Sequence, residues 1–252
     1  MVIAIIQARL GSTRLPNKVL KKIENKTLLE LYINRLKPSK LIDKIVIATT
    51  ANPEDDAIAK LADRINIESF RGSENDLLDR YYQCAKKYNG DIVVRVTPDD
   101  PFVDYEVVDR AIQIFLEGDY DFVINHFEPT FPEGLDVEVY SINALKESWE
   151  KAKLLSEREH VFPYIQNNQN QFKIHNFKQD KDFSHLRWTI DHQCDFDMTE
   201  KIYSHLYKTK KVFLQNDILE LLEKYPEIAL MNSHIKRKEG VNKTKENDGL
   251  IS

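Results

Sequence analysis

The sequence predicts an α/β protein built on a mostly parallel β-sheet with helices on both of its faces. Short apolar runs rich in β-branched residues alternate with helical patterns through the first half of the chain, as in strand–helix–strand repeats. The 252 residues are 42% hydrophobic and 31% charged. This composition is sufficient for a sizeable core and excludes a chain that is disordered throughout.

Five strands and four helices are expected in the first half, because apolar runs of strand length are separated by longer segments with apolar residues at helical spacing. The expected strands are Val2–Ile6, Lys44–Ala48, Ile67–Phe70, Asp91–Val96 and Asp121–Ile124. The expected helices are Leu28–Leu36, Glu54–Arg64, Asn75–Tyr88 and Tyr105–Leu116. Right-handed crossovers between parallel strands then place functional loops at the carboxyl ends of the strands.

The second half is less regular, and we expect it to add a small insertion arm, at about residues 127–176, to the main sheet. The expected strands are Leu135–Tyr140, Phe172–Phe177 and Leu186–Ile190, and the expected helices are Asn143–Leu155 and Glu157–Gln166. Residues 1–233 are predicted to form one domain. Residues 234–252 are rich in Lys, Glu and Asn with almost no apolar side chains, which predicts a mobile tail.

Charge and cysteine content exclude several classes of protein. The formal net charge is −5, whereas a protein that wraps nucleic acid is normally basic. No apolar run approaches the ~20 residues of a membrane helix. The apolar start lacks the basic residues and the length of a secretion signal. Two cysteines without CxxC spacing argue against a disulfide scaffold or a cysteine zinc site and favour the cytoplasm.

The most informative segment follows the first predicted strand and concentrates positive charge on one loop. Gly11 allows close backbone approach to a ligand, small donors follow it, and exposed N–H groups in such a turn bind anions. Three cations on the loop suit a nucleoside triphosphate, which carries roughly four negative charges. The alternative is a surface loop with solvated charges. The residues of this predicted phosphate loop are Gln7, Ala8, Arg9, Gly11, Ser12, Thr13, Arg14 and Lys18. The loop matches neither GxxxxGK[ST] nor GxGxxG.

The segment from Arg9 to Lys18, with the sequence RLGSTRLPNK, resembles the opening motif of the cytidylyltransferases that make CMP-activated sugar acids. This family includes CMP-Kdo synthetase and acylneuraminate cytidylyltransferase, and the spore-coat-polysaccharide (SpsF-like) branch is the most similar. Further matching segments are 46–50, 71–76, 95–101, 134–139, 157–160 and 187–191. The resemblance implies a glycosyltransferase-A-type, Rossmann-like fold, dependence on Mg²⁺ and a homodimer.

Two carboxylates directly follow the apolar run 92–96, where Pro101 stiffens the turn after Asp99 and Asp100. Mg²⁺ prefers one or two protein carboxylates and takes its other ligands from water and phosphate. Asp191, which ends the strand predicted at 186–190, can supply the second carboxylate. The resemblance likewise implies Asp99 as the first metal ligand and Asp191 as the second. The alternative is that Asp99 and Asp100 cap the helix near Tyr105 or solvate a turn.

Two departures from the family pattern concern the loops themselves. Pro98 stands where the sugar-acid enzymes commonly have Gly, and proline restricts the backbone there. Asn17 replaces the usual Gly before Lys18, and Asn tolerates a positive φ better than most residues. The segment 71–80 also departs from the family pattern. All three departures leave the predicted phosphate and metal chemistry intact.

Backbone groups near Gln7, Ala8 and Arg9 can pair with a cytosine, and the resemblance adds Arg71, Ser73 and Arg80 as nucleotide contacts. Arg80 is alternatively a surface partner of Asp76, four residues earlier. The predicted contacts to the acceptor sugar are Asp136, Glu138, Arg158, His160 and Arg187. Arg158 can bind a carboxylate or phosphate bidentately. Surface exposure is the alternative for Asp136 and Glu138. For Arg158 and His160 the alternative is that they face water at the start of a helix, whose positive end Glu157 and Glu159 favour.

The expected function is Mg²⁺-dependent transfer of CMP from CTP to a sugar acid, with release of pyrophosphate, for surface polysaccharide synthesis. Arg9, Arg14, Lys18 and Asp99 are expected to be the catalytic residues. The expected partners are CTP and a sugar acid or sugar phosphate, without nucleic acid or membrane. The alternatives are a guanylyl- or other nucleotidyltransferase acting on a sugar 1-phosphate, and a non-catalytic nucleotide-sugar binding protein.

Overall fold

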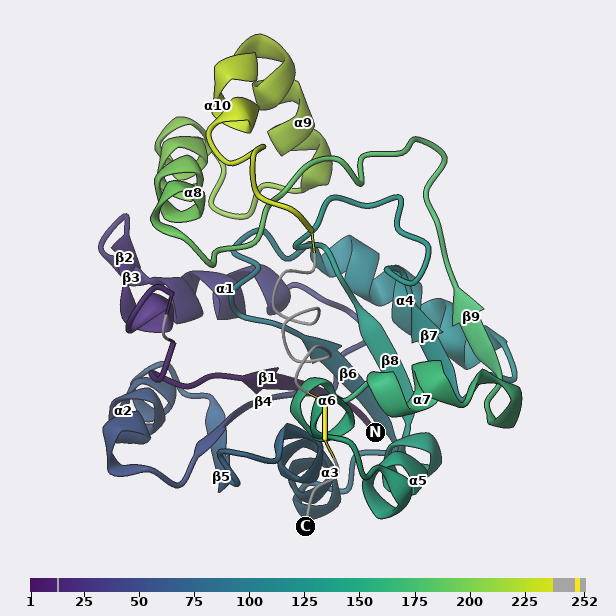
Figure 1. Ribbon diagram of the computed structural model, residues 1–252. Coiled ribbons are helices and arrows are strands. Elements are labelled where there is room, and N and C mark those ends of the chain that lie inside the picture. The colour runs from purple at the N-terminus through teal and green to yellow at the C-terminus, as the bar shows by residue number, and fades with distance from the viewer. Residues whose placement is uncertain (13, 238–247, 250–252) are drawn as a thin grey trace.

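The computed structural model describes residues 1–12, 14–237 and 248–249. Its centre is a seven-stranded sheet in the order β5-β4-β1-β6-β8-β7-β9, flanked by helices on both faces (Figure 1). The strands are β1 (Val2–Gln7), β4 (Lys44–Thr50), β5 (Glu68–Gly72), β6 (Ile92–Val96), β7 (Phe122–Ile124), β8 (Glu138–Ser141) and β9 (Ile174–Asn176). Strands β2 (Lys22–Ile23) and β3 (Lys26–Thr27) form a separate short hairpin.

The sheet is parallel except at β8. Strand β1 pairs in parallel with β4 and β6, and β4 pairs in parallel with β5. Strand β8 is antiparallel to its neighbours β6 and β7, and β7 is parallel to β9. Strands β1 and β6 are parallel neighbours in the interior of the sheet. The loops that leave their carboxyl ends therefore emerge side by side.

Two cores cover the two faces of the sheet, and β1 contributes to both because its side chains alternate. Val2, Ala4 and Ile6 belong to one core, and Ile3 and Ile5 belong to the other. The first core includes α1 (Leu28–Leu36), α2 (Asp56–Arg64), α4 (Tyr105–Glu117), α8 (Gln193–Leu206), α9 (Gln215–Lys224) and α10 (Pro226–Leu230). The second includes α3 (Leu77–Lys87), α5 (Ile142–Lys151) and α7 (Pro163–Asn167), with α6 (Leu155–His160) packed against α3.

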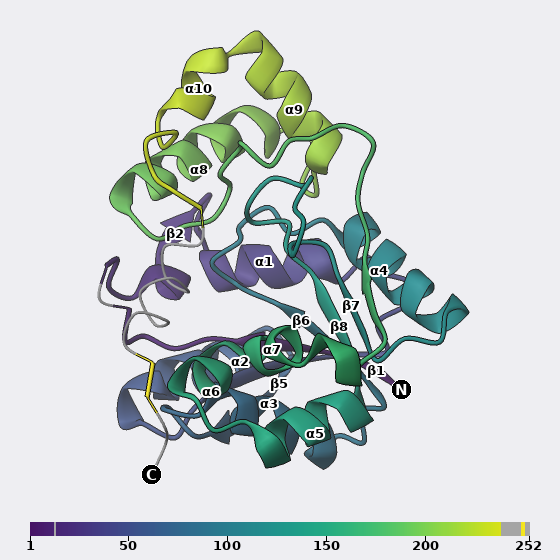
Figure 2. The same ribbon diagram turned by 45° about the vertical axis from the view of Figure 1, so that its right-hand side comes forward.

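The three C-terminal helices α8, α9 and α10 gather beyond α1, on the side of the molecule away from α3 and α5 (Figure 2). None of these three helices was predicted. Three short 3-10 helices complete the described elements, namely η1 (Lys18–Leu20), η2 (Pro53–Asp55) and η3 (Gln169–Gln171). In the described part of the chain, no helix is long and apolar enough to cross a membrane.

The elements predicted in the first half are confirmed, with shifts of a few residues at their ends. Helix α1 has the predicted bounds, and a capping box at Thr27 and Glu30 begins it. Helix α2 starts later than predicted, because η2 occupies the turn at Pro53.

In the second half, three expectations are corrected. Strand β8 lies within the main sheet and α5 packs on α3, so residues 127–176 belong to the main body and not to a separate arm. The helix predicted at 157–166 is two helices, because Pro163 lacks an N–H and starts α7. The segment 186–190 is not a strand. Its backbone bonds to two different segments, at Glu133 and Asp99, which leaves a single bridge instead of a ladder.

The predicted tail, 234–252, falls mostly outside the described residues, in 238–247 and 250–252. Its described parts contact the main body. Arg237 donates to Asp136 at 2.8 Å. Asp248 accepts hydrogen bonds from the backbone and the hydroxyl of Ser156 in α6, and the carbonyl of Gly249 accepts from Leu155.

Candidate active site

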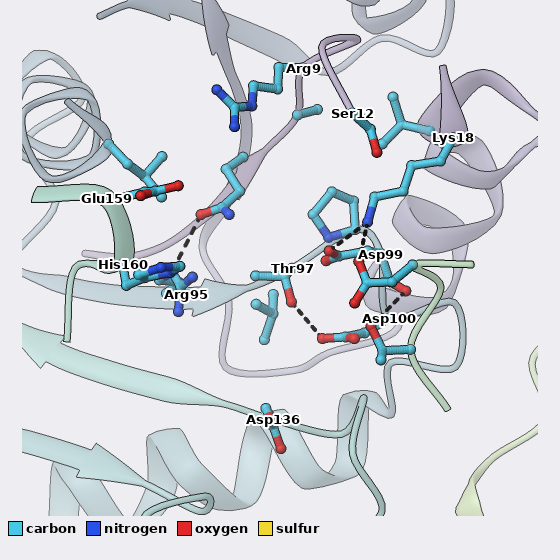
Figure 3. Close-up of a pocket in the computed structure, with 18 of the residues that line it drawn as sticks. Arg9, Ser12, Lys18, Arg95, Thr97, Asp99, Asp100, Asp136, Glu159 and His160 are labelled. Atoms are coloured by element: carbon cyan, nitrogen blue, oxygen red, sulfur yellow. Dashed lines mark hydrogen bonds and ion pairs between the residues drawn. The ribbon is translucent and has the colours of Figure 1, made fainter. Parts of the chain in front are cut away.

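A cleft of about 540 Å³ opens at the carboxyl ends of β1 and β6, where doubly wound sheets bind their ligands. Its volume is in the range of small-molecule sites. The predicted site residues that line it are Gln7, Ala8, Arg9, Gly11, Ser12, Arg14, Lys18, Arg80, Asp99, Asp136, Glu138, His160 and Asp191. Most of the predicted site is thus brought together in one cleft. Figure 3 shows Arg9, Ser12 and Lys18 along one wall and Glu159, His160 and Asp136 at a distance from them.

The loop after β1 carries the basic residues into the cleft. Asn17 adopts φ 56°, the left-handed conformation that the sequence suggested for this position, and η1 begins directly after it with Lys18. The backbone N–H of Leu10 donates to the buried carboxylate of Asp55 at 2.8 Å, which fixes the start of the loop. Thr13, predicted to bind nucleotide, lies outside the described residues.

Lys18 joins the basic loop to the two predicted metal ligands (Figure 3). Its Nζ lies 2.9 Å from Asp99 Oδ2 and 3.1 Å from Asp191 Oδ1, and it also donates to the carbonyl of Ile190 at 2.8 Å. Arg14 reaches the same Asp191 oxygen at 2.8 Å. Residues from three distant parts of the sequence therefore meet around one cation.

Backbone contacts explain how Asp99 and Asp191, 92 positions apart, become neighbours. The N–H of Ile190 donates to the carbonyl of Asp99 at 2.7 Å, and the hydroxyl of Thr189 lies 3.3 Å from the same oxygen. The segment 189–191 is thus held against the loop that follows β6. The two carboxylates are brought together by this contact, although 186–190 is not a strand.

Burial and charge act in opposite directions on these groups. Burial alone would raise the pKa of Asp99 and lower that of Lys18, but the opposite charges outweigh it. The pKa of Asp99 is therefore held below its ordinary value, and the pKa of Lys18 is raised. Burial and the nearby charge of Asp99 raise the pKa of Asp100 well above its ordinary value. Asp100 accepts a hydrogen bond from Thr97, so it orders the loop.

Arg187 holds Asp191 from behind, inside a buried ionic cluster. Its Nη2 lies 3.2 Å from Asp191 Oδ2, while Nη1 bonds Glu133 at 2.8 Å and Nε bonds Asp195 at 3.0 Å. Asp195, at the start of α8, also accepts the backbone N–H of Asp191 at 2.9 Å. Arg187 was predicted to contact the acceptor. It is absent from the cleft wall and positions Asp191 instead.

A second buried network forms the opposite end of the cleft, and two of its members were missed. Arg95 on β6 bonds Glu138 on the neighbouring β8 at 2.5 Å, and His126 Nε2 lies 3.0 Å from the same oxygen. Arg95 Nε also contacts Gln7 Oε1 at 3.4 Å. The amide oxygen of Gln7 therefore faces Arg95, and its amide N–H groups point away from Arg95. Arg95 was overlooked because it stands within an apolar strand, and His126 was interpreted as structural or exposed because the histidines show no zinc-motif spacing. An arginine within such a strand was the available signal.

Helix α6 supplies the last wall of the cleft through a strained turn. Val161 has φ 65° and ψ −55°, and the N–H of Phe162 donates to the carbonyl of His160 at 2.8 Å. This is a γ-turn, a conformation that a β-branched residue rarely adopts. The turn places His160 and Phe162 on the cleft wall together with Glu159. Glu159 and Phe162 were not predicted as site residues.

Three further predicted contacts do not line the cleft. Arg71 bonds the carbonyls of Thr50 and Asn52, which ties β5 to the loop before α2. The hydroxyl of Ser73 accepts from the backbone of Asp76. Arg158 donates to Asp76 and to the carbonyl of Trp149. Their polar groups bond within the protein around the cleft, so the structure gives these residues a structural role and does not bring them together with the others.

The residues present fit a hard divalent cation. Asp99 and Asp191 already share one cation, the Lys18 ammonium, so their oxygens can meet on a single ion. No group of three or more His, Cys, Asp or Glu able to hold a metal occurs among the described residues. Two carboxylates beside the predicted phosphate loop suit Mg²⁺, which takes its remaining ligands from water and phosphate oxygens.

The chain is similar to known proteins over nearly its whole described length. A family model described as cytidylyltransferase matches residues 3–233. The chain is 30% identical over 237 residues to the spore coat polysaccharide biosynthesis protein SpsF of Bacillus subtilis, covering 90% of this chain and 96% of SpsF. The solved structure of a cytidylyltransferase from Leptospira borgpetersenii matches with a TM-score of 0.88 and 36% identity, over 94% of this chain and 99% of that one.

A CMP-2-keto-3-deoxy-manno-octonic acid synthetase, solved in complex with CTP, matches with a TM-score of 0.64 and 14% identity, over 81% of this chain and 98% of that one. At this identity the likeness is one of fold alone, and it confirms the predicted Rossmann-like α/β fold. The family model and the similarity to SpsF show the family as well as the fold, because both extend over nearly the whole chain. The protein therefore belongs to the cytidylyltransferase family.

Proposed function

We propose that this cytidylyltransferase transfers CMP from CTP to a hydroxyl of a sugar acid of the Kdo or nonulosonate kind, with Mg²⁺, for surface polysaccharide synthesis. The single observation that carries the proposal is the meeting of Lys18 with Asp99 and Asp191, beside a basic loop, in one cleft. The similarity to SpsF supports it, because that relative is a spore coat polysaccharide biosynthesis protein.

The basic loop would hold the triphosphate. Arg9, Arg14 and Lys18 are its cations, and Gly11 leaves its backbone open, since among the described residues a Cβ there would meet only Glu54 and Glu74, at 3.7 and 4.0 Å. Asp99 and Asp191 would hold the metal ion, which when bound polarises the α-phosphate and lowers the pKa of a hydroxyl close to it. Ala8 and Arg80, which line the same cleft, would contact the cytidine.

In this arrangement the acceptor oxygen attacks the α-phosphorus in line, a new P–O bond forms, and the bond to the β-phosphate oxygen breaks. Pyrophosphate leaves with the charge that Arg9, Arg14 and Lys18 neutralise. The contribution of the protein is positioning and charge stabilisation, as in other phosphoryl transfers. Asp136, Glu138 and His160 on the far wall would orient the acceptor. No side chain is assigned as a general base.

The test is pyrophosphate release with four nucleoside triphosphates, each paired with a panel of sugar acids and a panel of sugar 1-phosphates, with and without Mg²⁺. The proposal expects release with CTP and a sugar acid, and loss of release when EDTA removes the metal. Release with GTP and a sugar 1-phosphate would support the guanylyltransferase alternative. Equal rates in EDTA would contradict the metal assignment.

The homodimer and the cytoplasmic location remain part of the proposal. Cys84 and Cys194 are both free thiols, in agreement with a reducing compartment. Light scattering of the purified protein measures the oligomeric state, and fractionation of cells measures the location.

A further inference from the structure

The Lys18 ammonium has all three of its hydrogen-bond donors engaged within the protein. A lysine ammonium carries three N–H donors, and here the acceptors are Asp99 Oδ2 at 2.9 Å, Asp191 Oδ1 at 3.1 Å and the carbonyl of Ile190 at 2.8 Å. The side chain is only 13% exposed. In this position the Lys18 ammonium is hydrogen-bonded to both carboxylates and to a carbonyl, and it has no N–H donor left for a phosphate.

Both oxygens of Asp191 already face cations. Oδ1 accepts from Lys18 and from Arg14, and Oδ2 lies 3.2 Å from Arg187 Nη2. A metal ion that binds Asp191 must therefore displace one of these cations or bind against its charge. Arg187 is 5% exposed and locked by Glu133 and Asp195, so it is the least able to move.

Of the three cations, Lys18 is the one that we expect a metal ion to displace from Asp191. It begins η1 at the end of the basic loop, its four-carbon stem is flexible, and it touches both carboxylates, whereas the contact that Arg14 makes with this pair is to Asp191. The same loop is the predicted phosphate site. A triphosphate there offers new acceptors to an ammonium that leaves the carboxylates.

We propose that Lys18 and the divalent cation alternate at the Asp99–Asp191 pair, so that metal and nucleotide bind cooperatively. This inference rests on the proposed function. Without nucleotide, the ammonium is paired with both carboxylates and opposes metal entry. When nucleotide is bound, the ammonium donates its hydrogen bonds to the phosphates, and the two carboxylates become available to the metal. Because coupling between two binding sites is reciprocal, each ligand strengthens the binding of the other by the same factor.

The first measurement is the affinity of Mn²⁺ for the protein alone, by electron paramagnetic resonance of the free ion. Lys18→Met removes the competing charge and keeps an apolar stem. We expect this variant to bind Mn²⁺ about tenfold or more tightly than the wild type, within the usual 5–150-fold range of site coupling. Lys18→Arg retains a cation and is expected to bind Mn²⁺ no more tightly than the wild type.

The second measurement is the affinity for CTP in EDTA and in saturating Mn²⁺. The wild type is expected to bind CTP about tenfold or more tightly with Mn²⁺, and Lys18→Met is expected to lose most of that difference. Lys173→Met is the matched control, since Lys173 pairs with Asp119 on the surface away from the cleft, and it should leave both affinities unchanged. Thermal melting checks that each variant is folded.

Two outcomes overturn the inference, and they differ in what they say about the proposed function. If Lys18→Met binds Mn²⁺ as weakly as the wild type while Asp99→Asn abolishes the Mn²⁺ effect on CTP affinity, the metal site stands and the alternation is wrong. If Asp99→Asn leaves the Mn²⁺ effect intact, the metal site itself lies elsewhere, and both proposals fail.

Discussion

At the scale of the residue, charged side chains in and behind the cleft are paired with opposite charges in small groups. Lys18 pairs with Asp99 and Asp191, Arg187 pairs with Glu133 and Asp195, and Arg95 pairs with Glu138. Removing one partner from a buried group leaves an uncompensated charge, which costs more than the pair contributes. Single substitutions therefore separate the groups that hold the fold from those that are available to a ligand.

Asp99→Asn tests the proposed metal ligand. The amide keeps the shape of the side chain and can still accept a hydrogen bond from Lys18, but it loses the charge that a metal requires. We expect pyrophosphate release from CTP to fall by about 10²–10⁴-fold, with thermal stability close to that of the wild type. Turnover near the wild-type rate in a stopped-time pyrophosphate assay would refute the assignment.

Two glycine substitutions separate ligand contact from backbone strain. In Gly11→Ala the added Cβ comes no closer than 3.7 Å to any atom of the part of the chain that the structure describes, so stability should change by less than about 0.5 kcal/mol. Its methyl group would stand where the phosphates approach, so the KM for CTP should rise about tenfold or more. Gly134→Ala has φ 106° and a Cβ 2.7 Å from the Trp188 carbonyl, so it should lose about 2 kcal/mol or more. Urea unfolding and steady-state kinetics measure both, and an unchanged KM in Gly11→Ala would contradict the phosphate loop.

At the scale of the element, the cleft depends on how separate segments are tied together. Arg187 ties the segment before Asp191 to the start of α8 through Asp195, and to the Glu133 segment. Arg158 ties α6 to α3 and α5 through Asp76 and Trp149. Asp76 itself caps α3, where its Oδ1 accepts from Asp79 N at 2.8 Å. Two arginines predicted to bind ligand thus hold in place elements that line the cleft.

Arg187→Met should destabilise the protein by about 3–5 kcal/mol at pH 7, because it leaves Glu133 and Asp195 buried without their cation. The effect depends on pH. Burial would raise the pKa of Asp195, but hydrogen bonds from Arg187 and its neighbours hold it below the ordinary value. The stabilisation is therefore complete above the unfolded pKa of about 3.9 and is lost as pH falls through the folded pKa. The gap between variant and wild type in urea unfolding should narrow below about pH 4. A gap that stays constant to pH 2 would contradict this account.

Arg158→Met should cost about 1–3 kcal/mol, because it removes hydrogen bonds from a charged group that is 11% exposed. Since α6 carries Glu159 and His160, the KM for the acceptor should rise more than the KM for CTP. The matched control is Lys151→Met on α5, whose exposed pair with Glu147 lies outside the cleft, and we expect no resolvable change there. Equal increases in both KM values would indicate general loosening rather than a role in orienting α6.

At the scale of the whole molecule, the sequence predicts the elements better than their arrangement. Local patterns were sufficient for α1 and for the strands of the first half, since each buries an apolar face. The position of β8 between β6 and β7 depends on long-range pairing, which no local pattern reveals. The pairing of Asp99 with Asp191 was expected from neighbouring strands, and the structure achieves it through a backbone contact at Ile190. Arg95 and His126 were not predicted as site residues, because their charged partner, Glu138, is distant in the sequence and the residues next to them are mostly apolar.

The central claim is that one cleft holds the triphosphate on the basic loop and the metal on the acidic pair. The most direct measurement is a crystal structure with CTP and Mn²⁺, in which anomalous scattering locates the ion. The account predicts an anomalous peak bound by carboxylate oxygens of both Asp99 and Asp191, with the Lys18 ammonium on a phosphate oxygen. A nucleotide seated away from Lys18, or a peak away from both carboxylates, would contradict it.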